Sequence, residues 1–395
     1  MRLSDDPPRT TDVVVVGGGI VGAATAFFAT RAGLRCVVVE TRPALGTLTT
    51  PASTGAFRLQ FDNPEEVALV RESIALFDAF AEVAELPNYD LCIQKQGYLF
   101  CATTAAAAQR QSDFVDALHG WGVEDVELLD ADEARYRFPY LSPAVIQARY
   151  RAADGWLDPR RLTIGYARAS TATICLSTPA LGITQRGGRV VAVDTPRGQI
   201  ACDQVVIAAG PFSGRVAGLA GLQLDLRPVI RQKLLIPHLP AIPAWAPMTI
   251  DEETAAHWRP WGSGCYALWT DADTPAGEPL DDVPTTTRFA FDLLDPGSPR
   301  ALARISPFWS QVWDEGTISW SLQAGQYTYT PDHRPLLGPS AVDGLHLNCG
   351  YSGHGIMASA GGSRLMVDAL LGRLPGADNP FRPDRPMVER RFDIL

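Results

Sequence analysis

The sequence predicts an α/β fold in two domains, one on a parallel sheet that is discontinuous along the chain, the other an α+β domain on a mostly antiparallel sheet. Three observations support this prediction. A run of valines near the N-terminus leads into a glycine-rich turn and an alanine-rich segment. A second strand, glycine turn and helix pattern returns at residues 345–371. Between them, residues 226–330 hold seven of the nine tryptophans and are typical of short alternating strands.

The first observation is the segment 12–40. Residues 13–16 are four consecutive valines with no polar face, which is typical of a strand buried on both sides in a parallel sheet. The alanine-rich stretch after the glycines predicts a helix to about Ala32, and residues 36–39 predict a second strand. This order of strand, glycine turn, helix, strand and acid is that of a Rossmann-like dinucleotide-binding unit.

The turn residues have separate physical roles in such a unit. Gly17 permits the tight turn, Gly19 lets a pyrophosphate approach the backbone, and Gly22 lets the helix pack against the strand. Ile20 and Val21 stand at the helix N-terminus, where free N–H groups and a partial positive charge favour phosphate. The alternative is a glycine-rich turn in some other α/β unit.

Glu40 ends the second strand, where its carboxylate can accept hydrogen bonds from a ribose diol and would repel a 2′-phosphate. Thr41 and Arg42 follow it and belong to the same predicted site. These residues alone do not separate FAD from NAD.

The bulk composition excludes several classes of protein. The chain has 395 residues, enough for two domains, with 46% hydrophobic and 20% charged residues. A net charge of −10 argues against a nucleic-acid partner. No apolar run approaches the roughly 20 residues of a membrane span. The seven cysteines form no CxxC pair, which predicts reduced core residues in a cytoplasmic protein and no metal site.

The order of patterns predicts how the chain divides. A helix starts at Asn63-Pro64 and continues to about Glu85, a strand and a helix follow at 97–102 and 104–121, and a turn region occupies 135–143. The nucleotide-binding domain is predicted at residues 12–88, 150–225 and 330–385. The second domain is predicted at residues 89–149 and 226–329, after a loose leader at 1–11.

Two further stretches are predicted to approach the cofactor. Residues 204–208 form an apolar strand that ends in Ala209 and Gly210, which suits a second backbone approach to the ligand. A strand at 345–349 leads into a glycine-rich turn and a helix expected from near Gly355 to about Leu371. In the second domain, a Pro- and Asp-rich loop is expected from about Asp271 to Pro299. Its tryptophans suit either a sheet that caps a ligand pocket or an ordinary core.

Four motifs in order carry a family resemblance: GGGIVG with Glu40, VVIAAGPFS at 205–213, YTYTPDHRPLLG at 327–338 and GYSGHGIMASAGGSRL at 350–365. Together they resemble the FAD-dependent amine and amino-acid oxidoreductases, such as glycine oxidase, sarcosine oxidase and D-amino-acid oxidase. The resemblance spans nearly the whole chain. It implies FAD, a discontinuous FAD-binding domain, a substrate domain, and oxidation of a C–N bond next to a carboxylate.

The resemblance also assigns residues to parts of the cofactor. It places Ser53, Thr54 and Gly55 along the flavin ring, and the backbone of Ala180 at the adenine. It places the turn of Gly353, His354, Gly355, Ile356 and Met357 under the flavin pyrimidine, with His354 in a structural position. A helix N-terminus there would stabilise the negative charge of reduced flavin.

For the substrate, the resemblance places Tyr327 at a carboxylate-binding position and His257 at an active-site tyrosine position. Arg58, Arg231 and Arg259 are the cationic candidates, and the alternative for each is a surface or interdomain ion pair. Asp332 is expected to have a structural role in a turn.

Three departures from the sarcosine oxidases matter. Gly325 stands about where those enzymes bind flavin through a cysteine, so non-covalent FAD is expected. Met357 and Leu268 stand about where they carry lysines, which favours a dye- or quinone-type electron acceptor over oxygen.

Three functions remain open at this point. The primary hypothesis is an FAD-dependent oxidoreductase that transfers hydride from an amino acid or secondary amine to flavin N5, giving an imine. The alternative within enzymes is a hydroxy-acid or polyol dehydrogenase, in which His257 would serve as base. The third is a non-catalytic flavin-binding subunit of a larger complex.

Overall fold

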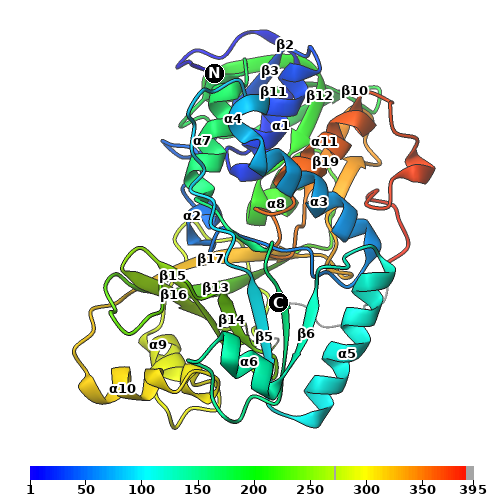
Figure 1. Ribbon diagram of the computed structural model, residues 1–395. Helices are drawn as coiled ribbons and strands as arrows, with labels where there is room; N and C mark the ends of the chain where they lie inside the picture. The colour runs from blue at the N-terminus through cyan, green and yellow to red at the C-terminus, as the bar shows by residue number, and fades with distance from the viewer. Residues whose placement is uncertain (271–272, 388–395) are drawn as a thin grey trace.

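The computed structural model describes residues 1–270 and 273–387. Two sheets lie one above the other in Figure 1, each with its own helices. The upper sheet has nine strands. Seven of them follow in the spatial order β1 (Arg2–Leu3), β9 (Thr173–Cys175), β3 (Cys36–Val39), β2 (Thr10–Val16), β12 (Gly198–Ile207), β11 (Arg189–Thr195) and β10 (Gly182–Arg186). The other two extend from β12: β19 (Leu345–Cys349) pairs with β12, and β18 (Leu336–Pro339) pairs with β19.

The valine run forms the centre of this sheet, as predicted. β2 pairs in parallel with β3 on one side and with β12 on the other. Val13 and Val15 pack into the cluster that contains α1 (Ile20–Arg31), while Val14 and Val16 pack against the hairpin strands β10 to β12. Because side chains alternate along a strand and both faces are covered, every position of the run is apolar.

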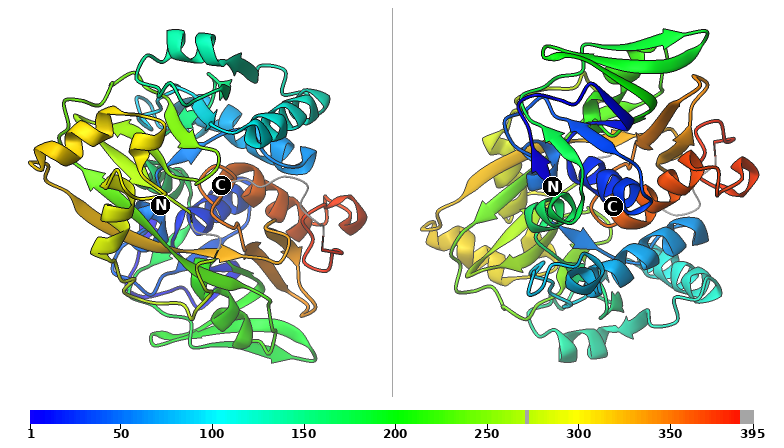
Figure 2. Two further views of the ribbon diagram at one scale, coloured as in Figure 1. Left: turned by 90° about the horizontal axis from the view of Figure 1, so that it is seen from below. Right: turned by 90° about the horizontal axis from the view of Figure 1, so that it is seen from above.

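Helices cover one face of the upper sheet and a β-hairpin covers the other. The helices that cover this face and share the larger core cluster are α1, α3 (Pro64–Asp78), α7 (Pro159–Ala169) and α11 (Ser359–Leu370), and α5 (Ala105–Gly120) of the lower part also packs into it. The view from above in Figure 2 shows the green strands β10 to β12 on one side of the blue α1 and the other helices on the opposite side. Shorter helices are α2 (Thr49–Ala52), α4 (Phe80–Val83) and α8 (Ser213–Gly218).

The lower sheet has eight strands and is antiparallel except where β14 and β5 pair in parallel. The order is β17 (Ser321–Tyr329), β13 (Arg227–Ile236), β16 (Gly264–Leu268), β15 (His257–Trp261), β14 (Met248–Asp251), β5 (Tyr98–Ala102), β7 (Gln147–Arg151) and β6 (Glu127–Asp130). Its helices are α5 (Ala105–Gly120), α6 (Ala131–Arg137), α9 (Thr287–Leu294) and α10 (Phe308–Glu315). A two-stranded sheet pairs β4 (Ala56–Phe57) with β8 (Gly155–Trp156).

The two faces of the lower sheet differ in chemistry. The face away from the upper sheet packs Trp258 and Trp309 with α9 and α10 into an apolar core. The alternate residues of the same strands, among them His257, Arg259 and Lys233, point the other way and are nonetheless buried. The sheet therefore turns a polar, cationic face toward the upper sheet.

Several local predictions are corrected. The residues expected as a loose leader contain β1, which pairs with β9, and the first residues of β2. Part of the expected turn region at 135–143 is helix α6, which Asp130 caps by accepting from the N–H groups of Asp132 and Glu133. The loop expected at 271–299, whose first two residues lie outside the described part, contains α9. The domain limits stay a prediction.

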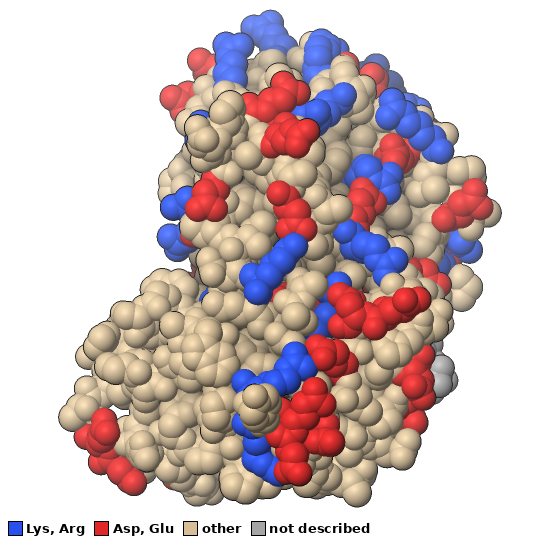
Figure 3. Space-filling view, in the orientation of Figure 1, with Lys and Arg blue, Asp and Glu red and all other residues tan. Residues whose placement is uncertain are grey.

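Two surface observations bear on possible partners. On the face shown in Figure 3, Lys and Arg are scattered among Asp and Glu and do not form one basic tract. That face therefore has no continuous basic surface to which a polyanion would bind. Within residues 1–270 and 273–387, no helix is both long and apolar enough to cross a lipid bilayer.

The first prediction concerns the packing of α1 on β2. A Cβ atom at Gly22 would lie 1.9 Å from the carbonyl oxygen of Gly17. Gly22→Ala should therefore lower the free energy of unfolding by at least the roughly 1–3 kcal/mol that overpacking usually costs. Urea denaturation of the cofactor-free protein measures the change. Gly214→Ala in α8 is the control, because its Cβ would have nothing within 4 Å, and it should be neutral or slightly stabilising. Equal stability of both variants would contradict the prediction.

Candidate functional site

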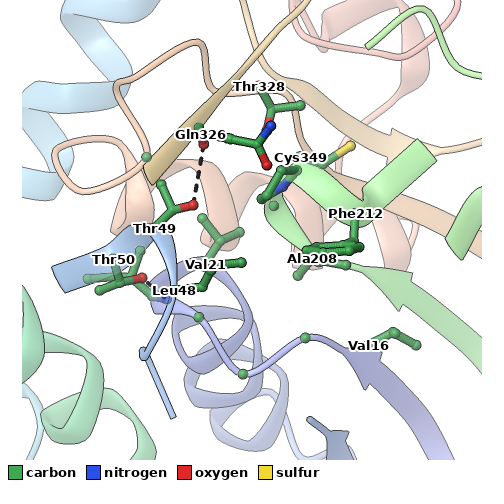
Figure 4. Close-up of a pocket in the computed structure, with 18 of the residues that line it drawn as sticks. Val16, Val21, Leu48, Thr49, Thr50, Ala208, Phe212, Gln326, Thr328 and Cys349 are labelled. Carbon is green, nitrogen blue, oxygen red and sulfur yellow. Dashed lines mark hydrogen bonds between the residues drawn. The ribbon is translucent and has the colours of Figure 1, made fainter. Parts of the chain in front are cut away.

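A cavity of about 440 Å³ lies between the carboxyl edge of the upper sheet and the lower sheet. The ends of four parallel strands form its floor, at Val16, Val39, Ala208 and Cys349. Figure 4 shows Val16 and Ala208 on the side of the upper sheet, with Gln326 and Thr328 of β17 on the opposite side. A crevice at the carboxyl ends of parallel strands is where open α/β sheets bind ligands.

The three glycines of the first turn meet three different constraints. Gly17 has φ +114°, and a Cβ there would lie 2.5 Å from the carbonyl oxygen of Ala208. Gly22 is required by the close contact of α1 with the turn. Gly19 differs, because the nearest atom to a Cβ there is the hydroxyl oxygen of Thr50 at 3.6 Å. A side chain at 19 would thus enter the cavity without disturbing the fold.

The N-terminus of α1 opens into this cavity. Ile20 and Val21 line it, and the first turn of α1 contains no acidic residue. The N–H of Ile20 donates to the Thr50 hydroxyl at 3.3 Å. The positive end of the helix is therefore not neutralised by a protein carboxylate, which suits a bound phosphate.

Glu40 forms the wall at one end of the cavity. Its Oε2 accepts from the N–H of Gly18 at 2.5 Å, and its Oε1 accepts from the N–H of Arg42 at 2.7 Å. Burial raises the pKa of this carboxyl, although both hydrogen bonds oppose the shift. Thr41, Arg42 and Ala180 line the same end, so the residues predicted for the adenosine half lie together.

The opposite end brings together residues far apart in sequence: Ser53, Tyr327, Gly353, Gly355 and Ile356 all line it. Gly353 has φ +98°, and a Cβ there would lie 2.6 Å from the Tyr327 ring, so the turn packs directly on that ring. The Thr49 hydroxyl donates to the Gln326 carbonyl at 3.3 Å and joins α2 to β17, as Figure 4 shows.

Two turns differ from the sequence-based expectation. Helix α11 begins at Ser359, not near Gly355, because residues 355–358 form turns in which the N–H of Ala358 donates to the His354 carbonyl at 3.0 Å. Its N-terminus is therefore displaced from the cavity. Met357 and His354 do not line the cavity; His354 packs edge-on against Phe61 with centroids 4.9 Å apart. That contact supports its structural position.

Gly325 lies against α2. A Cβ at this position would be 3.0 Å from the Cβ of Ala52, so a larger side chain here would push against α2. Thr54 and Gly55 also do not line the cavity, although Ala209 and Gly210 do. The carbonyl of Thr54 instead accepts from Arg259, and Gly55 allows close approach to the Leu157 carbonyl.

The substrate candidates surround one buried region beside Ser53 and Tyr327. The positive charge of Arg58 acts on the pKa values of Tyr98, Tyr327 and His257, so these groups lie within electrostatic range of Arg58, and of the four only Tyr327 lines the cavity. Burial raises the pKa of Tyr327 to about 12, so its hydroxyl is neutral and can donate. Arg58 itself is buried and donates to the Gln60 carbonyl.

His257 is neutral over the physiological range. Burial lowers its pKa to about 4. Its Nδ1 lies 2.8 Å from the Ala255 carbonyl, so Nδ1 carries the proton and Nε2 is left as an acceptor.

None of the three candidate arginines lines the cavity. Arg259 donates to the carbonyls of Thr54 and Pro260, and Arg231 donates to the Tyr329 hydroxyl at 3.2 Å. Asp332 holds Arg385 through two hydrogen bonds, at 2.8 and 3.0 Å, as expected for a structural turn.

Sequence reasoning missed four residues near the site: Thr50, Tyr98, Lys233 and Gln326. For Lys233 a signal exists, since Arg231 and Lys233 stand two residues apart in β13 and therefore share one face of the strand. No pattern marks Thr50 or Gln326, because their positions depend on contacts between segments distant in sequence. None of the nine tryptophans lines the cavity, so the tryptophans of the second domain form core and surface, not a cap.

The residues fit FAD. The glycine turn and α1 offer a cradle for the pyrophosphate, Glu40 suits the ribose, and the end near Tyr327 and Gly353 offers a wall for the flavin ring. Within the described residues, no group of three or more His, Cys, Asp or Glu side chains is placed to hold a metal.

Comparisons with known proteins agree with this site. The sequence model of a family described as FAD dependent oxidoreductase matches residues 12–369. The chain is 27% identical to FAD-dependent oxidoreductase domain-containing protein 1 of Xenopus laevis, over 98% of this chain and 86% of that protein. It is 25% identical to sarcosine oxidase subunit beta of Rhodobacter capsulatus, over 88% and 82%. Glycine oxidase from Geobacillus kaustophilus superposes with a TM-score of 0.81 at 24% identity, over 96% and 100%.

The second prediction tests the pyrophosphate cradle. Gly19→Val should yield a folded protein without FAD, because the side chain would occupy cavity space and contact no protein atom closer than 3.6 Å at its Cβ. The flavin-to-protein ratio after purification in excess FAD measures binding, and circular dichroism measures folding. Loss of the helix cap should cost no more than about 1 kcal/mol. A variant that purifies with full flavin content would exclude Gly19 from the cradle.

Proposed function

The chain belongs to the family of FAD-dependent oxidoreductases, and from this premise we propose that it oxidises a C–N bond of a small amino acid or secondary amine. We further propose that it holds FAD without a covalent bond and passes electrons to a dye- or quinone-type acceptor in preference to oxygen. The contact of Gly325 with Ala52 supports non-covalent binding, since a cysteine side chain at 325 would meet α2.

One observation carries the substrate class: Tyr327 lines the redox end of the cavity, and the charge of the buried Arg58 acts on it and on Tyr98. A guanidinium and neutral hydroxyls offer donors to a carboxylate, and Tyr327, the one of these groups that lines the cavity, brings no negative charge to an ammonium. This favours an amino acid whose amine binds in the neutral form. The names of the relatives, sarcosine oxidase subunit beta and glycine oxidase, belong to the same chemistry.

The chain's own residues then orient the substrate and exclude water. The Tyr327 hydroxyl would donate to the carboxylate and Arg58 would balance its charge. An apolar cluster of Tyr98, Phe100, Trp156, Met248, Ile250 and Ala56 forms dry walls nearby. When bound, FAD supplies the hydride acceptor for this oxidation, whose organic product is an imine.

A hydroxy-acid or polyol substrate is the second candidate. It is favoured by the acceptor-capable Nε2 of His257, which could take the alcohol proton. With a pKa of about 4, however, His257 is a weak base, and amine oxidation from the neutral amine needs none.

One experiment tests the proposal directly. The FAD-loaded enzyme is mixed without oxygen with a panel of amines, amino acids and hydroxy acids, and bleaching of the flavin band is followed. Bleaching by amino acids or secondary amines supports the proposal, whereas bleaching by hydroxy acids alone overturns it. Admitting air then separates an oxidase from a dehydrogenase.

The third prediction concerns Tyr327. Tyr327→Phe should lower kcat/KM for the true substrate about tenfold or more, the effect of losing a hydrogen bond to a charged group worth roughly 1.5–3 kcal/mol. Tyr140→Phe is the matched control, because its hydroxyl bonds Thr249 beside the core on the other face of the sheet. Equal kinetics for wild type and Tyr327→Phe would remove Tyr327 from the substrate site.

The fourth prediction separates the two chemistries. His257→Ala should lower kcat/KM less than tenfold if the substrate is an amine, because no proton acceptor is then needed. His346→Ala removes a second buried imidazole, which bonds Gln204 in the upper sheet, and controls for lost packing. A loss of several orders of magnitude in kcat/KM for His257→Ala, but not for His346→Ala, would show that the substrate is an alcohol.

A further inference from the structure

Two buried cations of the lower sheet hold the cofactor-lining segment 51–54 by its main chain. Lys233 is 2% exposed, and its Nζ donates to the carbonyls of Pro51 at 3.1 Å and Ser53 at 2.9 Å. Arg259 is 3% exposed and donates to the carbonyl of Thr54. Three carbonyls of four consecutive residues are thus bound by side chains of the other sheet.

Neither cation has an acidic partner. Both pack on the ring of Tyr266, with Nζ of Lys233 4.3 Å and the guanidinium carbon of Arg259 4.5 Å from its centroid. Within residues 1–270 and 273–387, no carboxylate forms an ion pair with either side chain. Arg160 on α7 is a third positive charge that acts on Lys233. The side-chain charges that act on Lys233 are therefore positive, while Asp158 acts on the neighbouring Tyr266.

Ser53 shows which part of the cavity these positive charges lie near. Ser53 lines the cavity with Tyr327 and Gly353, at the end away from Glu40. The ammonium of Lys233 does not line the cavity itself but binds the carbonyl of Ser53, which does. The register of β13 and β16 pairs Leu234 with Ala267, so Lys233 comes next to Leu268 on the side that faces the upper sheet.

We propose that Lys233, with Arg259, is a positioning residue for the redox end of the FAD site: it holds segment 51–54 in the cavity wall and supplies positive charge that favours the reduced, anionic flavin. This inference rests on FAD binding in the proposed orientation. It does not rest on the identity of the substrate.

Reduction of the flavin and protonation of Lys233 must affect each other equally. If a positive charge at Lys233 favours a negative charge on the flavin, then reduction of the flavin must raise the proton affinity of Lys233 by the same factor. Burial, Arg259 and Arg160 lower the pKa of Lys233 to about 7. The groups that face it are Arg259, Tyr266, Arg160 and the carbonyls of segment 51–53, so no protein acid competes with the flavin for this effect.

The composition of the chain makes the test unusually direct. The sequence contains two lysines, Lys95 and Lys233. Lysine labelled with carbon-13 at Cε therefore gives two signals, and Lys95, which is half-exposed and paired with Asp78, is an internal control. Both signals are titrated in the FAD-loaded protein, once oxidised and once reduced with dithionite.

We expect reduction to raise the pKa of Lys233 by about one unit, a tenfold change in proton affinity, and to leave Lys95 unchanged. At pH 6, where Lys233 is protonated, Lys233→Met should shift the ratio of reduced to oxidised flavin against a reference dye about tenfold toward oxidised. For a two-electron couple that is 29.6 mV. Lys95→Met should leave the ratio unchanged.

A pKa of Lys233 that is the same in both redox states would overturn the proposal, and this holds even where Lys233→Met does not fold. An unchanged dye ratio in a folded Lys233→Met protein would also overturn it. Because dithionite reduces the flavin without substrate, a protein that shows the shift but oxidises no amine would contradict only the proposed function.

Discussion

The contact between α1 and the glycine turn is the constraint on which the cofactor site depends. Gly22 allows α1 to approach the Gly17 carbonyl, and this places the helix N-terminus at the carboxyl edge of β2. That edge is also where β3, β12 and β19 end, so one close contact aligns the pyrophosphate cradle with Glu40, Ala209 and the final turn. Any residue larger than glycine would separate the helix dipole from the cavity floor.

The second requirement is a wall for the other end of the ligand, and here the two domains share one segment. Residues 49–55 follow the first βαβ unit in sequence, yet side chains and main chain of the lower sheet hold them. Thr49 bonds β17, and Lys233 and Arg259 bond carbonyls further along. The redox end of the cavity therefore exists only when both sheets are folded and packed together.

Charge is distributed unevenly along this cavity. One end has a carboxylate, Glu40, held by the N–H groups of Gly18 and Arg42. The other end is bordered by buried Arg259 and Lys233, whose hydrogen bonds go to main-chain carbonyls. Carbonyls satisfy the donors without cancelling the charge. A ribose at the first end and an anionic flavin or carboxylate at the second match this polarity.

Local sequence determined the parts of the fold that depend on neighbours along the chain. The valine run, the glycine turn, the Asn63 cap and the strand at 345–349 are all found where propensity and pattern predict them. The pairing of residues 2–3 with β9 and the burial of Lys233 were decided by contacts between distant segments. A sequence pattern records which face of an element is apolar. It does not record which distant carbonyl, ring or strand edge will meet that face, and those contacts set the substrate end of the site.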